Sequence, residues 1–335
     1  MTVKTRAELL ADISTYLATN GAGGISAQDL RDRLEDMVAS ATFPEDPVSG
    51  GEGVCNFRLT LQSGTAVSIT DQTAKTTLYL TPHRGNAIGL YSGGAWSVLR
   101  SAEVSISLAT LTNGKPYDVF AYNDSGTVTL ELLVWTNDTA RATALATQDG
   151  ILVKSGDATR RYLGTIYASA AGQCEDSLVK RYCWNYYNRV PRPMRATDAT
   201  NSWAYNTSTI RQANNSAANQ LNFVQGVVED EVTARAIHFV DINNVQPSIP
   251  ATGIGLDSTT AFATGCLSQL AASSAIGSGS TWYALLAMLD TYVSAAGRHY
   301  LAWLERGAGA ATNTWAGDNN NPTFQQTGIT GAILG

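Results

Sequence analysis

The chain has 335 residues, a formal net charge of −6 and only 15% charged residues, against roughly 25% in an average soluble protein. Nucleic-acid binding requires concentrated lysine and arginine to neutralise phosphates, and the sequence has no basic cluster beyond Lys180-Arg181 and residues 192–195. The N-terminus lacks the apolar core of a signal peptide, and no stretch reaches the roughly 18 apolar residues of a membrane span. We therefore expect synthesis in the cytoplasm, no nucleic-acid partner and no membrane insertion.

Two short helices are predicted in the first forty residues. Thr5 and Glu8 form a capping box, in which each side chain satisfies a backbone N–H group at a helix start, and this helix would run from about Arg6 to Thr19. After a break rich in glycine, Ser26 caps a second helix. The apolar positions are Leu9, Ile13 and Leu17 in the first helix and Leu30, Leu34, Met37 and Ala41 in the second.

The apolar residues of the second helix recur at steps of four, three and four, which is a heptad seam. Two turns of such a seam are too short to be stable alone, so the segment must gain stability from other contacts. One interpretation is a helical hairpin folded onto its own domain. The other is that several copies of the chain associate through residues 1–45 and attach there to a larger assembly.

Residues 44–53 are rich in proline and glycine and mark a linker, because proline cannot continue a helix and disfavours helical geometry in the residue before it. Beyond the linker the apolar period changes to two, as in half-buried strands. Phe57, Leu59 and Leu61 alternate in this way with polar residues. The turn-forming stretches 92–95 and 123–126 separate strand-like segments and predict antiparallel hairpins.

Residues 172–189 are rich in tyrosine and fit either a helix or an aromatic strand. Pro191 and Pro193 mark a second boundary, after which strand patterns return. Residues 282–289 are all apolar, which indicates a strand buried on both faces, although length alone does not exclude a helix. The strand patterns of this part cover 222–228, 231–240, 281–292, 298–305 and 328–335.

The predicted fold class is mainly β, with a short N-terminal helical hairpin followed by two antiparallel β domains. Residues 1–45 form the helical segment, residues 46–190 an antiparallel β domain, and residues 191–335 a C-terminal jelly-roll-like β-sandwich. Helical periodicity is absent between the strands, which argues against a parallel α/β sheet.

Residues capable of catalysis form no recognisable motif. His83, His238 and His299 lack the spacing of metal ligands, and the sequence has no P-loop, nucleophile elbow or HExxH motif. A Ser-His-Asp arrangement is not excluded, since such triads assemble in space. We expect no enzymatic activity, no cofactor and no metal. The cysteines are predicted to be reduced and mostly buried: Cys55, Cys174, Cys183 and Cys266.

Two acidic stretches have alternative interpretations. Glu229 and Glu231 could share one side of a strand as the carboxylate pair that a polysaccharide-cleaving enzyme needs, but a solvated turn between two strands is the simpler interpretation. Residues 318–322 could bind a cation through their oxygens, but they lack the ligand pattern of an EF-hand loop and also fit a polar turn.

Three tryptophans are candidate contacts for a glycan. Trp203, Trp303 and Trp315 lie in sequence rich in polar loops, where exposed rings could stack on sugars. Such rings more often anchor a core or an interface. The sequence therefore marks these residues as candidate glycan contacts without excluding a structural role.

Short sequence stretches in all three segments resemble segments of one group of known proteins. They are Thr5-Arg6-Ala7-Glu8-Leu9-Leu10, Ile25-Ser26-Ala27-Gln28-Asp29-Leu30-Arg31-Asp32, Gln148 to Gly156 with Arg160 to Thr165, and Gly297 to Glu305. Together they resemble tailed-bacteriophage virion proteins, in which a short helical start precedes a β-structured fibre, spike or tail component. The resemblance implies a homotrimer, attachment by the N-terminus and an exposed C-terminal part. None of the strings is catalytic, so no catalytic residue is carried over.

These observations predict a structural component of the virion: a head or tail fibre, a spike or a decoration protein. We expect its partners to be further copies of itself and other virion proteins that bind residues 1–45. The alternatives are an adhesin that binds a host receptor or glycan, and a spike that depolymerises polysaccharide.

Overall fold

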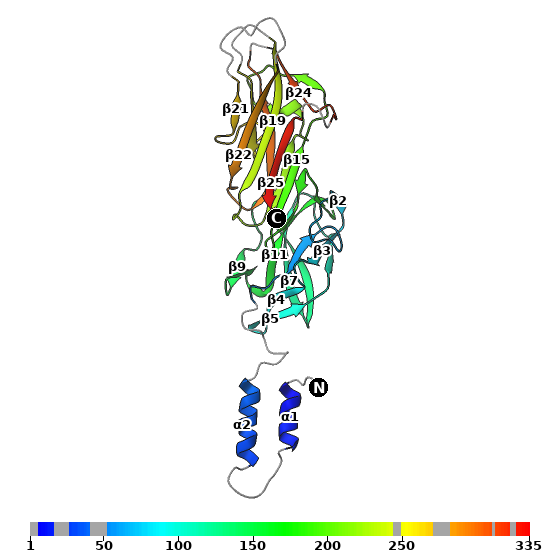
Figure 1. Cartoon of the computed structure of the whole chain (residues 1–335), viewed down its shortest axis with the longest axis vertical. Coiled ribbons are helices and arrows are strands. Elements are labelled where there is room, and N and C mark those ends of the chain that lie inside the picture. Colours follow the sequence, from blue (N-terminus) through cyan, green and yellow to red (C-terminus); the bar gives the residue numbers. More distant parts are fainter. Residues whose placement is uncertain are drawn as a thin grey trace.

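The computed structural model describes residues 6–16, 27–40, 52–243, 249–270, 282–309, 312–321 and 326–335. These residues form mainly β-strands, preceded by helices α1 (Arg6–Tyr16) and α2 (Ala27–Ser40) (Figure 1). The predicted fold class is thus confirmed: a short helical start followed by antiparallel β structure.

Helices α1 and α2 pack against each other. The first begins at Arg6, as its capping box predicts. Of the residues that the structure describes, none belongs to a helix long and apolar enough to cross a membrane. The predicted caps Thr5 and Ser26, together with Leu17 and Ala41, lie outside the described residues.

The strands before residue 190 build the N-terminal β part. Both predicted hairpin turns are confirmed: Gly93 and Gly94 join β4 to β5, and Ser125 and Gly126 join β7 to β8, all with positive φ. Residues 172–189 form short strands rather than a helix. The strands are β1 (Phe57–Thr60), β2 (Gln72–Lys75), β3 (Thr77–Pro82), β4 (Ala87–Ser92), β5 (Ala95–Arg100), β6 (Val104–Ser107), β7 (Pro116–Asp124), β8 (Thr127–Val134), β9 (Leu145–Gln148), β10 (Ile151–Lys154), β11 (Asp157–Ala170), β12 (Gln173–Asp176), β13 (Lys180–Arg181) and β14 (Cys183–Asn185).

The remaining strands build the C-terminal part, where all five predicted strand regions are confirmed. They are β15 (Pro191–Ala196), β16 (Ser202–Ala204), β17 (Arg211–Gln212), β18 (Gln220–Gln225), β19 (Val232–Asn243), β20 (Ala251–Leu256), β21 (Leu267–Gln269), β22 (Trp282–Thr291), β23 (Gly297–Arg306), β24 (Thr312–Ala316) and β25 (Gly328–Leu334), with a 3-10 turn at Ala213–Asn215.

Two sheets face each other in the C-terminal part. One has the order β15-β25-β19-β24-β16, with β22 on the other edge of β19. The second contains β21, β20, β23 and β18 and continues through β13 and β12 into the N-terminal part. The link between β13 and β18 is a short parallel pairing, whereas the other described pairings are antiparallel. The predicted boundary near residue 190 therefore lies beside a sheet that spans both β parts, and the division into domains stays a prediction.

Arginine side chains join the two β parts at their junction. Arg192 of β15 donates to Asp176 of β12 at 2.6 Å and to the backbone oxygen of Ser68 at 2.9 Å. Arg181 also contacts Asp176, at 3.1 Å, and donates to the backbone oxygen of Pro193 at 2.6 Å. Because Asp176 is buried, both of its oxygens need such partners, and the three residues hold the parts together.

Arg58 is a third buried arginine at this junction. The alternation of β1 predicts that its side chain faces solvent, but this prediction is wrong, since both sides of β1 are buried and Arg58 is 2% exposed. Its guanidinium donates to the backbone oxygens of Ala66, Asn188 and Gly335, the last at 2.8 Å. Arg58 therefore ties the first strand of the body to the last residue of the chain.

We predict that Arg58→Ala lowers the free energy of unfolding by about 3 kcal/mol or more, because buried carbonyl oxygens that lose their donor each cost about 1–3 kcal/mol. Urea unfolding followed by tryptophan fluorescence measures this. Arg100→Ala is the matched control, since Arg100 is exposed and its side chain donates to the Asn86 side chain at 3.0 Å; we expect a change within about 0.5 kcal/mol. Equal effects of the two substitutions would contradict the proposed role of Arg58.

Candidate functional site

In the C-terminal part, β15, β25, β19 and β22 lie side by side in one sheet (Figure 1). The outer face of this sheet carries exposed apolar side chains. Side chains alternate between the two faces of a strand, and β19 follows this rule: Val232, Ala234 and Ala236 are buried, whereas Thr233 and Arg235 are exposed. We call the exposed side the open face. It is defined by the outward residues of these four strands.

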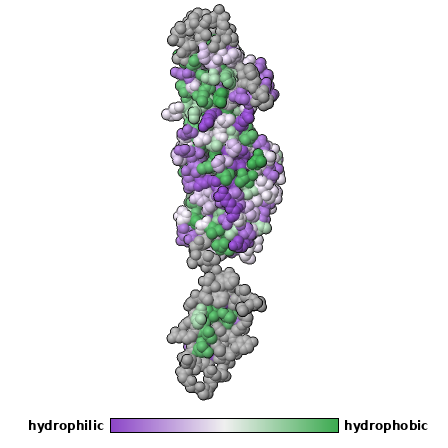
Figure 2. Space-filling model, in the orientation of Figure 1, coloured by the Kyte–Doolittle hydropathy of each residue, from purple (hydrophilic) through white to green (hydrophobic). Residues whose placement is uncertain are grey.

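Large apolar side chains lie next to one another on the open face. Ile237 of β19 pairs with Leu286 of β22, and the adjacent register positions place Met288 opposite Arg235. The exposed fractions are 40% for Ile237, 51% for Leu286 and 48% for Met288, and Trp282 at the start of β22 is 42% exposed. Figure 2, in the orientation of Figure 1, shows green hydrophobic patches interrupting the hydrophilic surface of this part.

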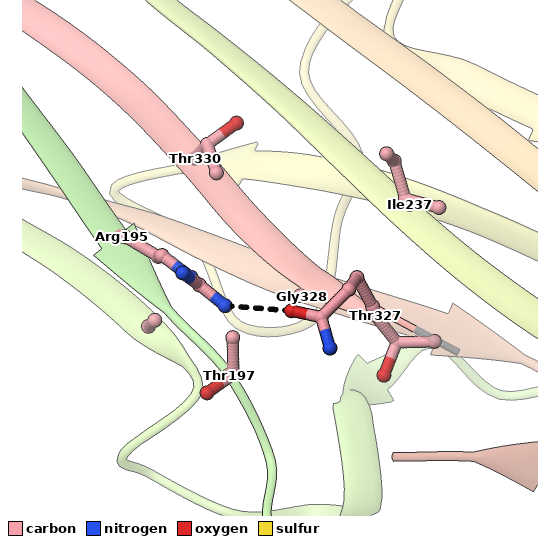
Figure 3. Close-up of a pocket in the computed structure, with 8 residues that line it drawn as sticks. Arg195, Thr197, Ile237, Thr327, Gly328 and Thr330 are labelled. Carbon is pink, nitrogen blue, oxygen red and sulfur yellow. Dashed lines mark hydrogen bonds between the residues drawn. The ribbon is translucent and has the colours of Figure 1, made fainter. Parts of the chain in front are cut away.

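A shallow hollow of about 280 Å³ lies at the β15 side of this face (Figure 3). Ile237 and Gly328 contribute its apolar lining, and Thr197 and Thr330 contribute hydroxyl groups. The guanidinium of Arg195 reaches across it and donates to the side-chain oxygen of Gln326 at 3.0 Å. The hollow therefore combines one cation with hydroxyl groups and an aliphatic wall.

A second hollow, of about 470 Å³, lies at the end of the open face next to the junction, lined by Pro191, Thr233, Tyr292 and Leu334 together with residues 229–231. Residues 226–231 form the turn between β18 and β19, as the simpler interpretation of this acidic stretch predicts. Arg189 pairs with Glu229 at 2.6 Å and with Asp230. Two of the three carboxylates are thus held by a structural ion pair.

The tryptophans that the sequence marks as glycan contacts lie together, but inside the sandwich. Trp303 of β23 and Trp315 of β24 are 0% exposed, so neither ring has a face open to a sugar, and the predicted contact is wrong for both. Trp203 of β16 is half-buried, and its Nε1 donates to a Glu305 carboxylate oxygen at 2.8 Å. These rings act as core anchors, which is the alternative that the sequence left open.

His238 lies at the centre of this tryptophan cluster. Its ring centroid is 4.4 Å from those of Trp303 and Trp315 and 5.4 Å from that of Trp203. The His238 side chain is fully buried, and neither of its ring nitrogens has a hydrogen-bond partner among the described residues. Because burial disfavours the charged imidazolium, it lowers the pKa of His238 well below the usual value.

Glu305 of β23 adds a second buried titratable group. One carboxylate oxygen accepts the Trp203 bond, and the other accepts from Arg211 Nε at 2.8 Å and from the backbone N–H of Asn214 at 3.2 Å. Burial raises the pKa of Glu305 to about 7, against the opposing effects of Trp203 and Arg211. Glu305 therefore titrates near neutral pH.

The sequence analysis predicts neither buried titratable group, His238 or Glu305, although the sequence contains a signal for His238. His238 shares its parity along β19 with Val232, Ala234 and Ala236, so the alternation places it on the inner face. For Glu305 no comparable signal exists, since its partners come from residues about ninety or more positions away.

The other predicted residues have plain structural roles. The backbone N–H of Asn320 donates to the Asp318 side chain at 2.9 Å in a polar turn. All four cysteines are free and buried, as predicted, and burial raises the pKa values of their thiols.

On α2, Leu30 and Met37 are 42% and 67% exposed, and Leu34 is half-buried. Leu9 of α1 is half-buried too, whereas the Ile13 side chain lies outside the described part.

Comparison with known proteins identifies no family. No family model matches the chain, and no curated protein sequence does. The solved structures that resemble it include the insecticidal delta-endotoxin Cry8Ea1 from Bacillus thuringiensis, with 8% identity, a TM-score of 0.23, and coverage of 84% of this chain and 52% of that one. The structure of infectious bursal disease virus Gx strain gives 11% identity, a TM-score of 0.23, and coverage of 78% and 75%. The chain thus spans about half the length of the toxin, and TM-scores this low support no conclusion about function.

We predict that His238→Phe flattens the acid side of the stability profile. The folded state resists protonation of His238, whereas the unfolded chain binds a proton below a pH of about 6.5. The stability that the folded state has while His238 stays neutral is therefore fully present above about pH 6.5. It falls as the pH decreases, because the unfolded chain then gains a proton that the folded chain does not bind. Glu305 has the opposite effect, because its raised pKa favours the folded state at low pH, but it is present in both proteins and cancels in the comparison.

Urea unfolding at pH 7.5, 6 and 5 measures the difference between His238→Phe and the unchanged protein. We expect the variant to gain stability relative to the unchanged protein as the pH falls, by at most about 1.4 kcal/mol per pH unit. The value at pH 7.5 controls for any change in packing. Parallel stability profiles would contradict a neutral buried His238.

Proposed function

We propose that this chain is a structural component of a tailed-bacteriophage particle, a homotrimeric fibre or spike attached by its N-terminal segment. One observation carries the proposal beyond the resemblance of the sequence strings. The single chain leaves an apolar stripe of α2 uncovered, with Leu30 and Met37 exposed seven positions apart.

Leu30 and Met37 occupy equivalent positions of successive heptads, so they lie on one side of the helix. A 14-residue helix gains little stability on its own in water. Helix α2 contacts α1, and its Val38 is buried, whereas Leu30 and Met37 are exposed. Association of several copies through the exposed stripe would bury both side chains, and each fully buried Leu or Met side chain contributes about 1.5–3 kcal/mol.

The β body also has features suited to an assembled particle. Few residues of the chain are charged, and several arginines are used inside the junction, where they bind backbone oxygens. A surface with little charge repels further copies of itself weakly. These features support a structural role, and two of the three tryptophans expected to contact glycans, Trp303 and Trp315, are buried.

We predict that a chain lacking residues 1–45 keeps its β body folded but is not incorporated into particles. The measurement compares particles assembled in a host that supplies either the truncated or the full chain, using quantitative mass spectrometry of purified particles. Far-ultraviolet circular dichroism of the truncated protein checks its fold. Normal incorporation of the truncated chain would overturn the attachment role.

A finer substitution tests the stripe itself. Leu30→Gln combined with Met37→Gln keeps good helix formers but removes the apolar stripe, and we expect reduced incorporation. Glu35→Gln is the matched control, because Glu35 is exposed on the same helix outside the stripe. Equal incorporation of the double variant and the control would exclude this stripe as the attachment surface.

A further inference from the structure

Strand β22 is apolar on both of its sides. Leu285, Ala287 and Leu289 point into the sandwich and are buried, whereas Leu286 and Met288 point outward. The sequence of residues 282–289 predicts a strand covered on both faces, and strands that are covered on both faces do show such continuous apolar runs. In the described part of the structure this expectation is wrong for the outer face, where Leu286 and Met288 are 51% and 48% exposed.

The neighbouring strand extends the uncovered surface. Ile237 pairs with Leu286, and the half-buried Phe239 pairs with the exposed Ala284. Cross-strand neighbours of this kind lie about 4.5–5.5 Å apart at their Cβ atoms. The apolar side chains therefore form one continuous patch across β19 and β22, and large apolar patches on soluble proteins mark interaction sites.

Charged residues of both signs border the patch. Arg235 of β19 and Arg195 of β15 lie in one row across the sheet, because each of them pairs with Thr330 of β25. Asp290 of β22 lies in the next row, opposite Thr233, and the exposed Glu231 precedes β19 at the same end. A surface with basic residues in one row and acidic residues beyond it offers complementary charges to a second surface of the same kind.

We propose that the open face is the surface through which the β bodies of neighbouring copies of this chain contact each other. The contact buries the patch formed by Ile237, Leu286, Met288 and Trp282. The basic residues Arg195 and Arg235 of one copy lie near the acidic residues Asp290 and Glu231 of the next. The self-complementary charges favour a second copy as the occupant. The inference rests on the proposed function only for the number of copies in the assembly.

The same association event would cover the stripe on α2. A copy bound at both places gains from each contact, because the second contact forms within an assembly that the first already holds together. The open face therefore adds affinity to any association through the helices. A substitution that disrupts the open face should weaken self-association measurably in the full chain.

The test is Leu286→Asp in the full chain, with sedimentation velocity over a concentration series as the readout. We expect self-association to weaken about tenfold or more, because an aspartate at the centre of an apolar interface is buried without a partner. Ile69→Asp is the matched control: Ile69 is 97% exposed in the N-terminal β part, and its substitution leaves association unchanged. Met288→Gln is a milder second variant, with the same expected direction, if Leu286→Asp fails to fold.

The outcomes separate this inference from the proposed function. Weaker association of both open-face variants, with normal circular dichroism, supports the inference. Association equal to that of the unchanged chain, or a full chain that is monomeric throughout the series, overturns it. Detection of the unchanged protein in purified particles depends on neither result, so the virion role can stand while the open face fails, or the reverse.

Discussion

The pairing of β19 with β22 imposes the constraint on which the C-terminal part depends. Strand β19 bonds to β22 along one edge and to β25 and β24 along the other, so it fixes the position of every neighbour in its sheet. Its inner face, with the inner face of β22, closes the core. The outer faces of the same strands carry Ile237, Leu286 and Met288. Among the described residues, these three side chains are 40% to 51% exposed, whereas the inner faces of the same strands are buried. The proposed contact between copies would cover the outer faces as well.

The scarcity of surface charge has a counterpart inside the protein. Arg58, Arg181 and Arg192 are buried at the junction of the two β parts and donate mainly to backbone oxygens. A planar guanidinium with several fixed donors suits this task, since it satisfies carbonyl groups that no strand pairs. These bonds would keep the open face at a fixed orientation relative to the N-terminal β part.

Local patterns in the sequence were sufficient for the fold class. The period-two alternation located the main strands, and the glycines near residues 93 and 126 located the hairpin turns, because both signals depend on neighbouring residues. The burial of Arg58 was not predictable, since its partners Asn188 and Gly335 are distant in sequence. The expectation of exposed rings at Trp303 and Trp315 is wrong for a related reason. The polar stretches around them are loops, but the rings belong to strands β23 and β24 and face the core. The apolar run at 282–289 predicts a strand covered on both faces, but among the described residues Leu286 and Met288 on its outer side are 51% and 48% exposed.

Hydroxyl-radical footprinting of the full chain tests the account most directly, because oxidation of methionine and tryptophan side chains follows their exposure. Met288 is 48% exposed in a single chain, whereas Met194 is 2% exposed and provides an internal reference. If copies cover the open face, Met288 and Trp282 are oxidised as slowly as Met194 at high protein concentration and become reactive on dilution. Rapid oxidation of Met288 at concentrations where the chain is assembled would contradict the account.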